Sequence, residues 1–117
     1  MKKLISPWKL DDLRLLFRAF GDHPFSAEWM YAVLQGVTIV YDARAVLNWR
    51  WENDFCVVSS GSINNERFPK AMLKRIKELI AEYPHIVIQS DNMGILSYMT
   101  KHGFNYDNDT QCYVRKG

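Results

Sequence analysis

The 117 residues of the sequence are enough for one ordinary globular domain, and we expect residues 1–117 to form a single domain. Hydrophobic residues make up 48% and charged residues 24%, a balance that excludes an intrinsically disordered chain. The net charge of +2 is too small to indicate a nucleic-acid-binding or membrane-binding surface.

Cysteine and apolar patterns exclude further classes of protein. Cys56 and Cys112 lie in apolar, strand-like runs without CxxC spacing, which predicts two buried thiols and no metal site. No segment approaches the ~20 apolar residues of a membrane-spanning helix, and the start of the chain lacks the apolar run of a signal peptide. We therefore expect neither metal nor membrane span, and a location in the cytoplasm.

The amino-terminal half of the sequence predicts a strand, two helices and a three-stranded meander. In the first helix Leu13, Leu16 and Phe17 repeat at helical spacing, and Gly21 and Gly36 follow the two helices as stop signals. The elements expected here are a strand at residues 3–8, helices at 10–20 and 27–35, and strands at 37–41, 45–51 and 55–59.

Two of these strands differ in their pattern of burial. Residues 45–51 alternate in character, which places Leu47, Trp49 and Trp51 together on one face of the predicted sheet. The apolar run at residues 55–59 instead predicts a strand that is buried on both faces.

The carboxyl-terminal half predicts two more helices and three more strands. The strongest amphipathic stripe contains Met72, Ile76 and Ile80, and Pro69 suits the first turn of the helix that carries it. The elements expected here are a helix at 67–83, a strand at 85–89, a helix from 90 or 91 to 101 or 102, and strands at 104–106 and 111–115. The whole order is β-α-α-β-β-β-α-β-α-β-β, which predicts an α/β (α+β) fold with a mixed sheet and helices on both faces.

This element order, together with one short motif, resembles the GNAT family of N-acetyltransferases. The fourth-helix pattern of that family is roughly N-x-x-A-x-x-x-Y-x-K-x-G-F. Asn92, Lys101, Gly103 and Phe104 stand at matching positions, and residues 8–13 resemble the start of the family's first helix. The resemblance covers nearly the whole chain in element order. It implies the GNAT fold, with a mostly antiparallel sheet, and acetyl-CoA as the cofactor if the protein is active.

A narrower resemblance is to small GNAT-like proteins of short-tailed phages, some of which are internal virion proteins. It rests on the strand segments 36–41 and 55–60 and on the basic helix that follows them. This resemblance implies a phage-encoded protein, located in the cytoplasm of the host cell or in the virion.

The resemblance also implies where a coenzyme A pyrophosphate would bind. In the family a glycine-rich loop before the third helix donates backbone amides to it, and the matching window here is 64–69. Arg67 and Pro69 stand at the glycine positions, and a proline has no amide hydrogen to donate. The remaining candidates for binding the cofactor are Asn64, Arg67, Lys70 and Asn92.

The residues that catalysis would need are also largely missing. Many enzymes of the family use a tyrosine on the fourth helix as general acid, and Met99 occupies that position. Tyr98 is one residue away, about a hundred degrees around the helix. Glu52 and His85 are the other candidate catalytic residues, and no pair of candidates forms a recognisable constellation.

Two main hypotheses follow for the function. The first is a non-catalytic GNAT-fold module with a degraded acetyl-CoA site, which binds a virion or host protein; the high aromatic content of 14% fits an interaction surface. The alternative is an acetyl-CoA-dependent N-acetyltransferase with an altered pyrophosphate loop. A third is a small-molecule or nucleotide binder that uses the cleft between the central strands. The sequence leaves the oligomeric state open.

Overall fold

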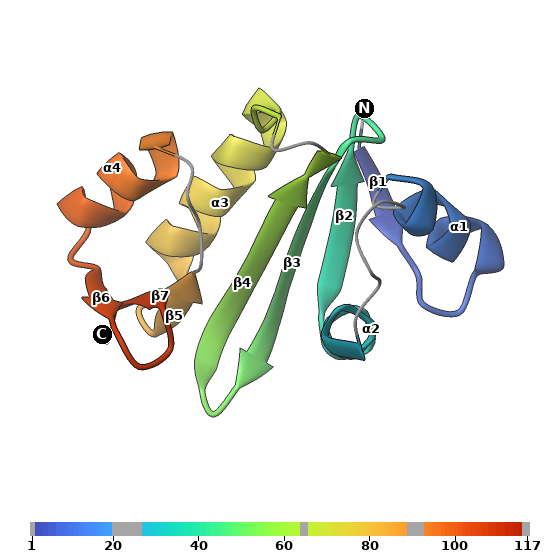
Figure 1. The fold of residues 1–117 in the computed structure, drawn as a ribbon. Coiled ribbons are helices and arrows are strands. Elements are labelled where there is room, and N and C mark those ends of the chain that lie inside the picture. The colour runs from blue at the N-terminus through green and yellow to red at the C-terminus, as the bar shows by residue number, and fades with distance from the viewer. Residues whose placement is uncertain (1, 20–26, 64–65, 89–92, 116–117) are drawn as a thin grey trace.

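The computed structural model of the protein describes residues 2–19, 27–63, 66–88 and 93–115. Within these residues the chain forms seven strands and four helices in the expected order (Figure 1). The strands are β1 (Lys2–Ile5), β2 (Val37–Tyr41), β3 (Ala45–Glu52), β4 (Phe55–Ser62), β5 (Ile86–Ile88), β6 (Asn105–Asp107) and β7 (Cys112–Arg115). The helices are α1 (Leu10–Ala19), α2 (Ala27–Gln35), α3 (Lys70–Glu82) and α4 (Met93–Lys101).

The strands form one sheet in the order β1-β2-β3-β4-β5-β7-β6. Strands β4 and β5 run parallel, because α3 carries the chain back across one face of the sheet between them. The other neighbouring pairs are antiparallel. The sheet is therefore mixed and mostly antiparallel, which confirms the predicted fold class.

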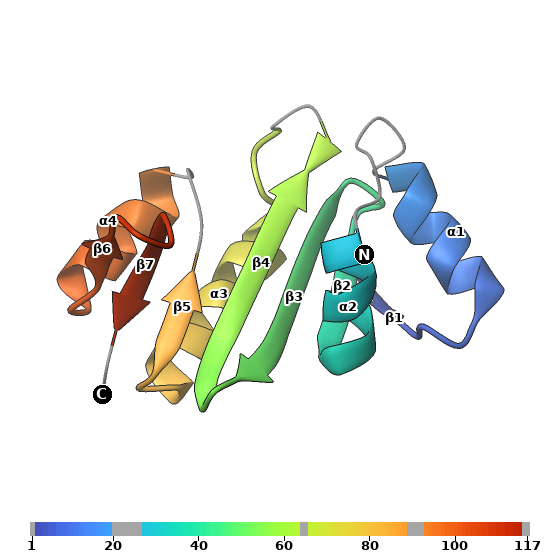
Figure 2. The same cartoon turned by 60° about the horizontal axis from the view of Figure 1, so that its bottom comes forward.

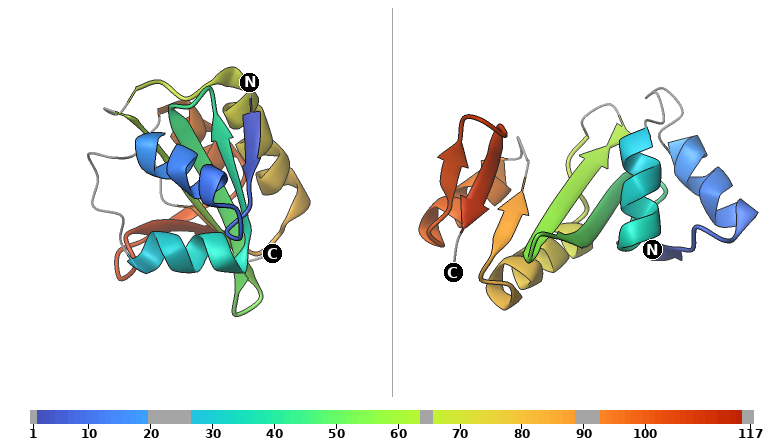
Figure 3. Two further views of the ribbon diagram at one scale, coloured as in Figure 1. Left: turned by 90° about the vertical axis from the view of Figure 1, so that its right-hand side faces the viewer. Right: turned by 90° about the horizontal axis from the view of Figure 1, so that it is seen from below.

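Helices cover both faces of the sheet, with α1 and α2 on one face and α3 and α4 on the other (Figure 3). The alternation predicted for β3 decides which side chains meet which helices. Leu47 and Trp49 belong to the core beneath α3, whereas Val46 belongs to the core beneath α1 and α2.

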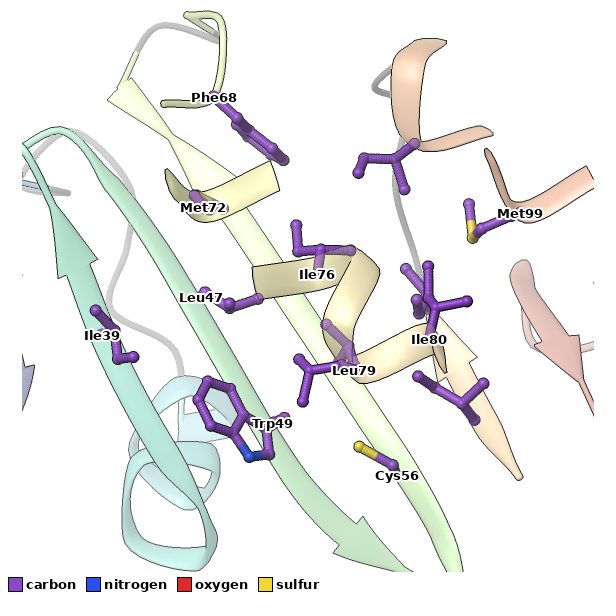
Figure 4. Packing of buried hydrophobic residues seen from close by; sticks show 14 of the residues in the cluster. Ile39, Leu47, Trp49, Cys56, Phe68, Met72, Ile76, Leu79, Ile80 and Met99 are labelled. Atoms are coloured by element: carbon purple, nitrogen blue, oxygen red, sulfur yellow. The ribbon is translucent and has the colours of Figure 1, made fainter. Parts of the chain in front are cut away.

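The larger core lies between the sheet and helices α3 and α4 (Figure 4). The helices contribute buried residues on one stripe each: Met72, Ile76, Leu79 and Ile80 from α3, and Ile95 and Met99 from α4. Burying one such side chain fully contributes about 1.5–3 kcal/mol. The apolar stripe predicted from the sequence is therefore what holds α3 against the sheet.

The smaller core lies on the opposite face and contains Ile5, Leu16, Val33, Val40 and Val46. Beside it, the buried amide of Asn48 donates to the Ala32 carbonyl oxygen and to the Thr38 hydroxyl, both at 2.9 Å. Because a buried amide without partners would be costly, these bonds fix the position of α2 over β2 and β3.

The two glycines that follow α2 and α4 are needed for different reasons. Gly103 has a φ of +80° and ends α4 in the left-handed conformation, as the sequence predicts. Gly36 has no positive φ, but a Cβ placed on it would overlap the Trp49 carbonyl oxygen and lie 2.8 Å from the Arg50 Cβ. Gly36 therefore allows the end of α2 to pack closely against β3.

Arg115 in β7 connects the ends of the two helices on the larger core. Its guanidinium donates to the carbonyl oxygens of Ile80, Tyr83 at 2.7 Å and Pro84 at 3.2 Å, which lie at the end of α3. It also donates to the His102 carbonyl oxygen after α4, at 3.3 Å. Because the carboxyl end of a helix carries partial negative charge, the Arg115 cation also interacts favourably with the dipoles of both helices.

The start of α3 differs from the prediction. The helix begins at Lys70 rather than at residue 67, and Pro69 is its N-cap, with φ −56° and ψ 147°, rather than a residue of the first turn. The reason is local, because the residue before a proline is disfavoured in helical conformation. Phe68 therefore lies outside the helix, and its side chain enters the larger core.

Burial also differs from the prediction at three places. In β4 Cys56 and Val58 are buried but Val57 is only half-buried, so the strand is buried on one face and not on both. Cys112 is half-buried, because β7 lies next to the edge of the sheet. Trp51 is 54% exposed at the hairpin end of β3, where it packs edge-on against Tyr83.

Candidate functional site: the β4–β5 opening and the α3–α4 groove

Strands β4 and β5 pair over only part of their length. Residues 56–58 pair with Ile86–Ile88, after which β5 ends and β4 continues to Ser62. Figure 2 shows the two strands diverging toward their carboxyl ends. An acetyltransferase would need an opening between these strands for the arm of coenzyme A, so the side chains around the divergence bear on that hypothesis.

The loop between β4 and α3 is fastened by side chains of the protein itself. Arg44, in the β2–β3 turn, donates to the Arg67 carbonyl oxygen at 2.6 Å and lies 3.7 Å from the Glu66 carboxylate. The Ser62 hydroxyl donates to the Glu66 carbonyl oxygen at 2.6 Å. The carbonyl oxygens of Glu66 and Arg67 are thus paired within the protein.

Phe68 and Pro69 close the part of this loop that faces the larger core. The Phe68 side chain is 9% exposed and points over the first turn of α3 toward α4 (Figure 4). Pro69 is also buried and offers no amide hydrogen. A buried aromatic ring thus lies next to Pro69, which stands at one of the two glycine positions of the resemblance and has no amide hydrogen to donate.

The first turn of α3 nevertheless keeps some capacity to bind an anion. The first bond within the helix is from the Leu73 amide to the Pro69 carbonyl oxygen, at 3.1 Å. The amides of Lys70, Ala71 and Met72 have no acceptor among the described residues, and no side chain caps them. Free amides at a helix start attract negative charge, and the Lys70 side chain is exposed beside them.

The candidate general acid on α4, Tyr98, lies at the edge of the larger core and not inside it. Met99 is fully buried in the larger core, as expected for the apolar face of α4. Tyr98 is half-buried on the outer side, where its ring stacks on His102 at 4.0 Å and lies 5.3 Å from the Lys77 ammonium. The Tyr98 ring therefore packs between the side chains of His102 and Lys77.

Glu52 and His85 lie at the hairpin end of β4, the opposite end from the loop before α3 (Figure 1). Glu52 is paired with Phe55 across the strands, and its carboxylate lies 3.7 Å from Arg50 Nε. The ring of His85 meets the Phe55 ring edge-on at 5.6 Å. The structure thus brings Glu52 and His85 together around Phe55. Tyr98, the third candidate catalytic residue, packs instead against His102 and Lys77.

A second feature, a groove of about 540 Å³, lies between α3 and α4 on their outer side. Its walls are lined by Lys70, Leu73, Lys74, Lys77, Glu78, Ala81 and Tyr98. Two residues predicted from the sequence line this groove: Lys70, a candidate for binding the cofactor, and Tyr98, a candidate catalytic residue.

The remaining predicted residues are placed as follows. Arg67 is exposed in the loop, with its backbone held by Arg44. Asn64 and Asn92 lie outside the described residues. Sequence reasoning missed Arg44, because nothing in its turn indicates a contact with a loop 23 positions later.

Within the described ranges, no group of three or more histidine, cysteine or acidic side chains is arranged to hold a metal ion. No helix in the described part of the chain is long and apolar enough to cross a membrane. Among the thiols, burial raises the pKa of Cys56 to about 11, which excludes a reactive thiolate there.

Comparison with solved structures shows which class of proteins shares this fold. The first is the Escherichia coli protein YhhK, named as an N-acetyltransferase and solved in solution with coenzyme A bound. It has a TM-score of 0.61 and 11% identity, over 100% of this chain and 98% of that chain. The second is the E. coli ribosomal-protein-S18-alanine N-acetyltransferase. It has a TM-score of 0.50 and 15% identity, over 98% of this chain and 90% of that chain.

The protein therefore has the GNAT fold, as the resemblance in the sequence implies. At these identities the likeness establishes the fold alone. No family profile and no curated protein matches the sequence.

Proposed function

We propose that the protein is a non-catalytic GNAT-fold module that binds another protein. The observation that carries this proposal is the loop before α3, where Phe68 and Pro69 are buried and Arg44 holds the backbone. Each backbone hydrogen bond to a charged group is worth about 1.5–3 kcal/mol. Losing two such bonds to a pyrophosphate would weaken coenzyme A binding by two or more orders of magnitude.

Exposed apolar side chains support the protein-binding part of the proposal. Trp8, just before α1, is 85% exposed, and Met93, the first residue of α4, is 77% exposed. Helices α1 and α4 lie at opposite ends of the molecule (Figure 1). Large side chains of these types are enriched where proteins meet, and a partner that covered either one would remove it from water.

Acetyl transfer from acetyl-CoA is the second candidate function. The free amides at the start of α3, with Lys70 beside them, favour an anion there, and the related fold of YhhK binds coenzyme A. In that case Tyr98, Glu52 and His85 are the catalytic candidates, although Glu52 and His85 lie far from the first turn of α3.

The phage assignment rests on the sequence resemblance alone. In this proposal the module is a component of the virion or a factor directed at a host protein. Its location is then the virion or the cytoplasm of the host cell.

Calorimetric titration with acetyl-CoA tests the proposal. We expect no binding by the unmodified protein at millimolar ligand, and a gain of binding for Pro69→Gly if the missing amide is the main defect. Pro7→Gly is the matched control, because Pro7 lies between β1 and α1, outside the loop.

Micromolar binding of acetyl-CoA by the unmodified protein would refute the non-catalytic proposal. The next experiment would then be a search for amine acceptors, with Tyr98→Phe, Glu52→Gln and His85→Ala as the variants to compare.

A further inference from the structure

The groove between α3 and α4 is lined by a row of lysines and, beside them, by the apolar side chains of Leu73 and Ala81. We propose that it docks an acidic helical segment of a partner protein. This inference rests on the proposed function and adds to it the surface and the chemistry of the partner.

The lysines are arranged in a row and are not neutralised. Lys70, Lys74 and Lys77 are spaced i, i+4 and i+7, so they follow one side of α3 over about 10 Å. None of the three has a carboxylate within 4.0 Å among the described residues. The acidic residue of the groove, Glu78, is paired with Arg75 at 3.1 Å.

Helix stability does not explain this arrangement. The first turn of α3 carries Lys70 and no acidic residue, although the helix dipole favours negative charge there. Across the groove, the Tyr98 ring of α4 lies 5.3 Å from the Lys77 ammonium of α3 and stacks on His102. The result is a row of positive charges beside the apolar side chains of Leu73 and Ala81.

The spacing of the charges favours a partner with several negative charges over a single phosphate. Gathering three ammonium groups on one phosphate would cost the conformational entropy of three long side chains and would bring like charges together. Carboxylates at positions i, i+4 and i+7 of a helix have the same spacing as the lysines, and apolar residues between them would face Leu73 and Ala81. The charge pattern of α3 therefore matches that of an acidic amphipathic helix.

The probe for the test is a synthetic helical peptide of about twelve residues, roughly 18 Å long, with glutamates at i, i+4 and i+7 and leucines beside them. Its matched control has glutamine in place of each glutamate. The readout is the amide spectrum of the isotope-labelled protein during titration. We expect shifts at Leu73, Lys77, Ala81 and Tyr98, affinity at least about tenfold weaker for the glutamine peptide, and weakening with added salt.

The variant Lys70→Gln/Lys74→Gln/Lys77→Gln should lose about tenfold or more in affinity for the acidic peptide. The matched control Lys2→Gln/Lys9→Gln/Arg14→Gln removes the same charge from β1, α1 and the segment between them, and should bind like the unmodified protein. All six side chains are exposed, so both variants should keep the thermal midpoint of the unmodified protein.

Several outcomes would overturn the inference. These are an absence of shifts in the groove at millimolar peptide, or an equal loss of affinity in both variants. Groove shifts produced by coenzyme A would assign a nucleotide to it instead, and shifts that depend on protein concentration alone would assign a second copy of the chain. If neither peptide nor coenzyme A binds, the inference fails while the proposed non-catalytic function stands.

Discussion

Gly36 lies where the end of α2 meets the backbone of β3, and there is no room there for a side chain. An alanine Cβ would overlap the Trp49 carbonyl oxygen, which belongs to the backbone and cannot turn aside. We predict that Gly36→Ala lowers the free energy of unfolding by about 1–3 kcal/mol, because α2 must move away from β3. Urea denaturation measures this loss.

Gly103→Ala is the control for that substitution. A Cβ at Gly103 would meet no atom within 4 Å, so its cost is only the positive φ, about 1–2 kcal/mol. A larger loss of stability at Gly103 than at Gly36 would contradict the steric explanation.

Among the elements, α3 and α4 depend on a residue that neither of them contains. Arg115 bonds carbonyl oxygens at the ends of both helices. We predict that Arg115→Met lowers the free energy of unfolding by about 2 kcal/mol, because these carbonyl oxygens lose a charged donor. Thermal unfolding followed by circular dichroism measures the change.

Two further substitutions sharpen the prediction. Arg115→Lys should recover only part of the stability, since one ammonium cannot span the ends of two helices as a guanidinium does. Arg14→Met removes an exposed arginine paired with Asp11 and should cost no more than about 1 kcal/mol. Equal losses for Arg14 and Arg115 would show that the bonds to the helix ends contribute nothing.

Element boundaries were predictable where a local signal marks them. The predicted bounds of α2 and β2 agree with the structure, because Gly36 separates a helical pattern from a β-branched one. The predicted start of α3 was wrong by three residues, since the apolar periodicity continues through Phe68 although that side chain belongs to the loop. A pattern of polarity cannot distinguish a helix residue from a loop residue that is equally buried.

At the scale of the whole molecule, the order of elements and the short motif that ends at Gly103 and Phe104 were together sufficient to predict the GNAT fold. The candidate site was less predictable, because its contacts join distant parts of the chain. The bond from Arg44 to Arg67 and the pairing of Lys77 with the Tyr98 ring depend on tertiary packing. The spacing of Lys70, Lys74 and Lys77 was visible in the sequence, but only the position of α4 shows that these lysines border a groove.

The larger core can be probed through its one thiol. Cys56 is fully buried, and its raised pKa, about 11, leaves almost no thiolate near pH 8. We predict that iodoacetamide at about pH 8 labels the half-buried Cys112 in the folded protein, and labels Cys56 only after urea opens the core. Mass spectrometry of the labelled protein distinguishes the two sites; equal rates for both thiols would contradict this account of the core.

The position of Arg115 in β7 also has a consequence for folding during synthesis on the ribosome. Helices α3 and α4 are synthesised before β7, so their terminal carbonyl oxygens bond to water until β7 has left the exit tunnel. A stalled chain with a carboxyl-terminal linker just long enough to expose both helices and hold β7 in the tunnel should therefore be more sensitive to proteases at these helices than a chain with a longer linker, which also exposes β7. Stable packing of this half of the molecule thus follows the emergence of β7.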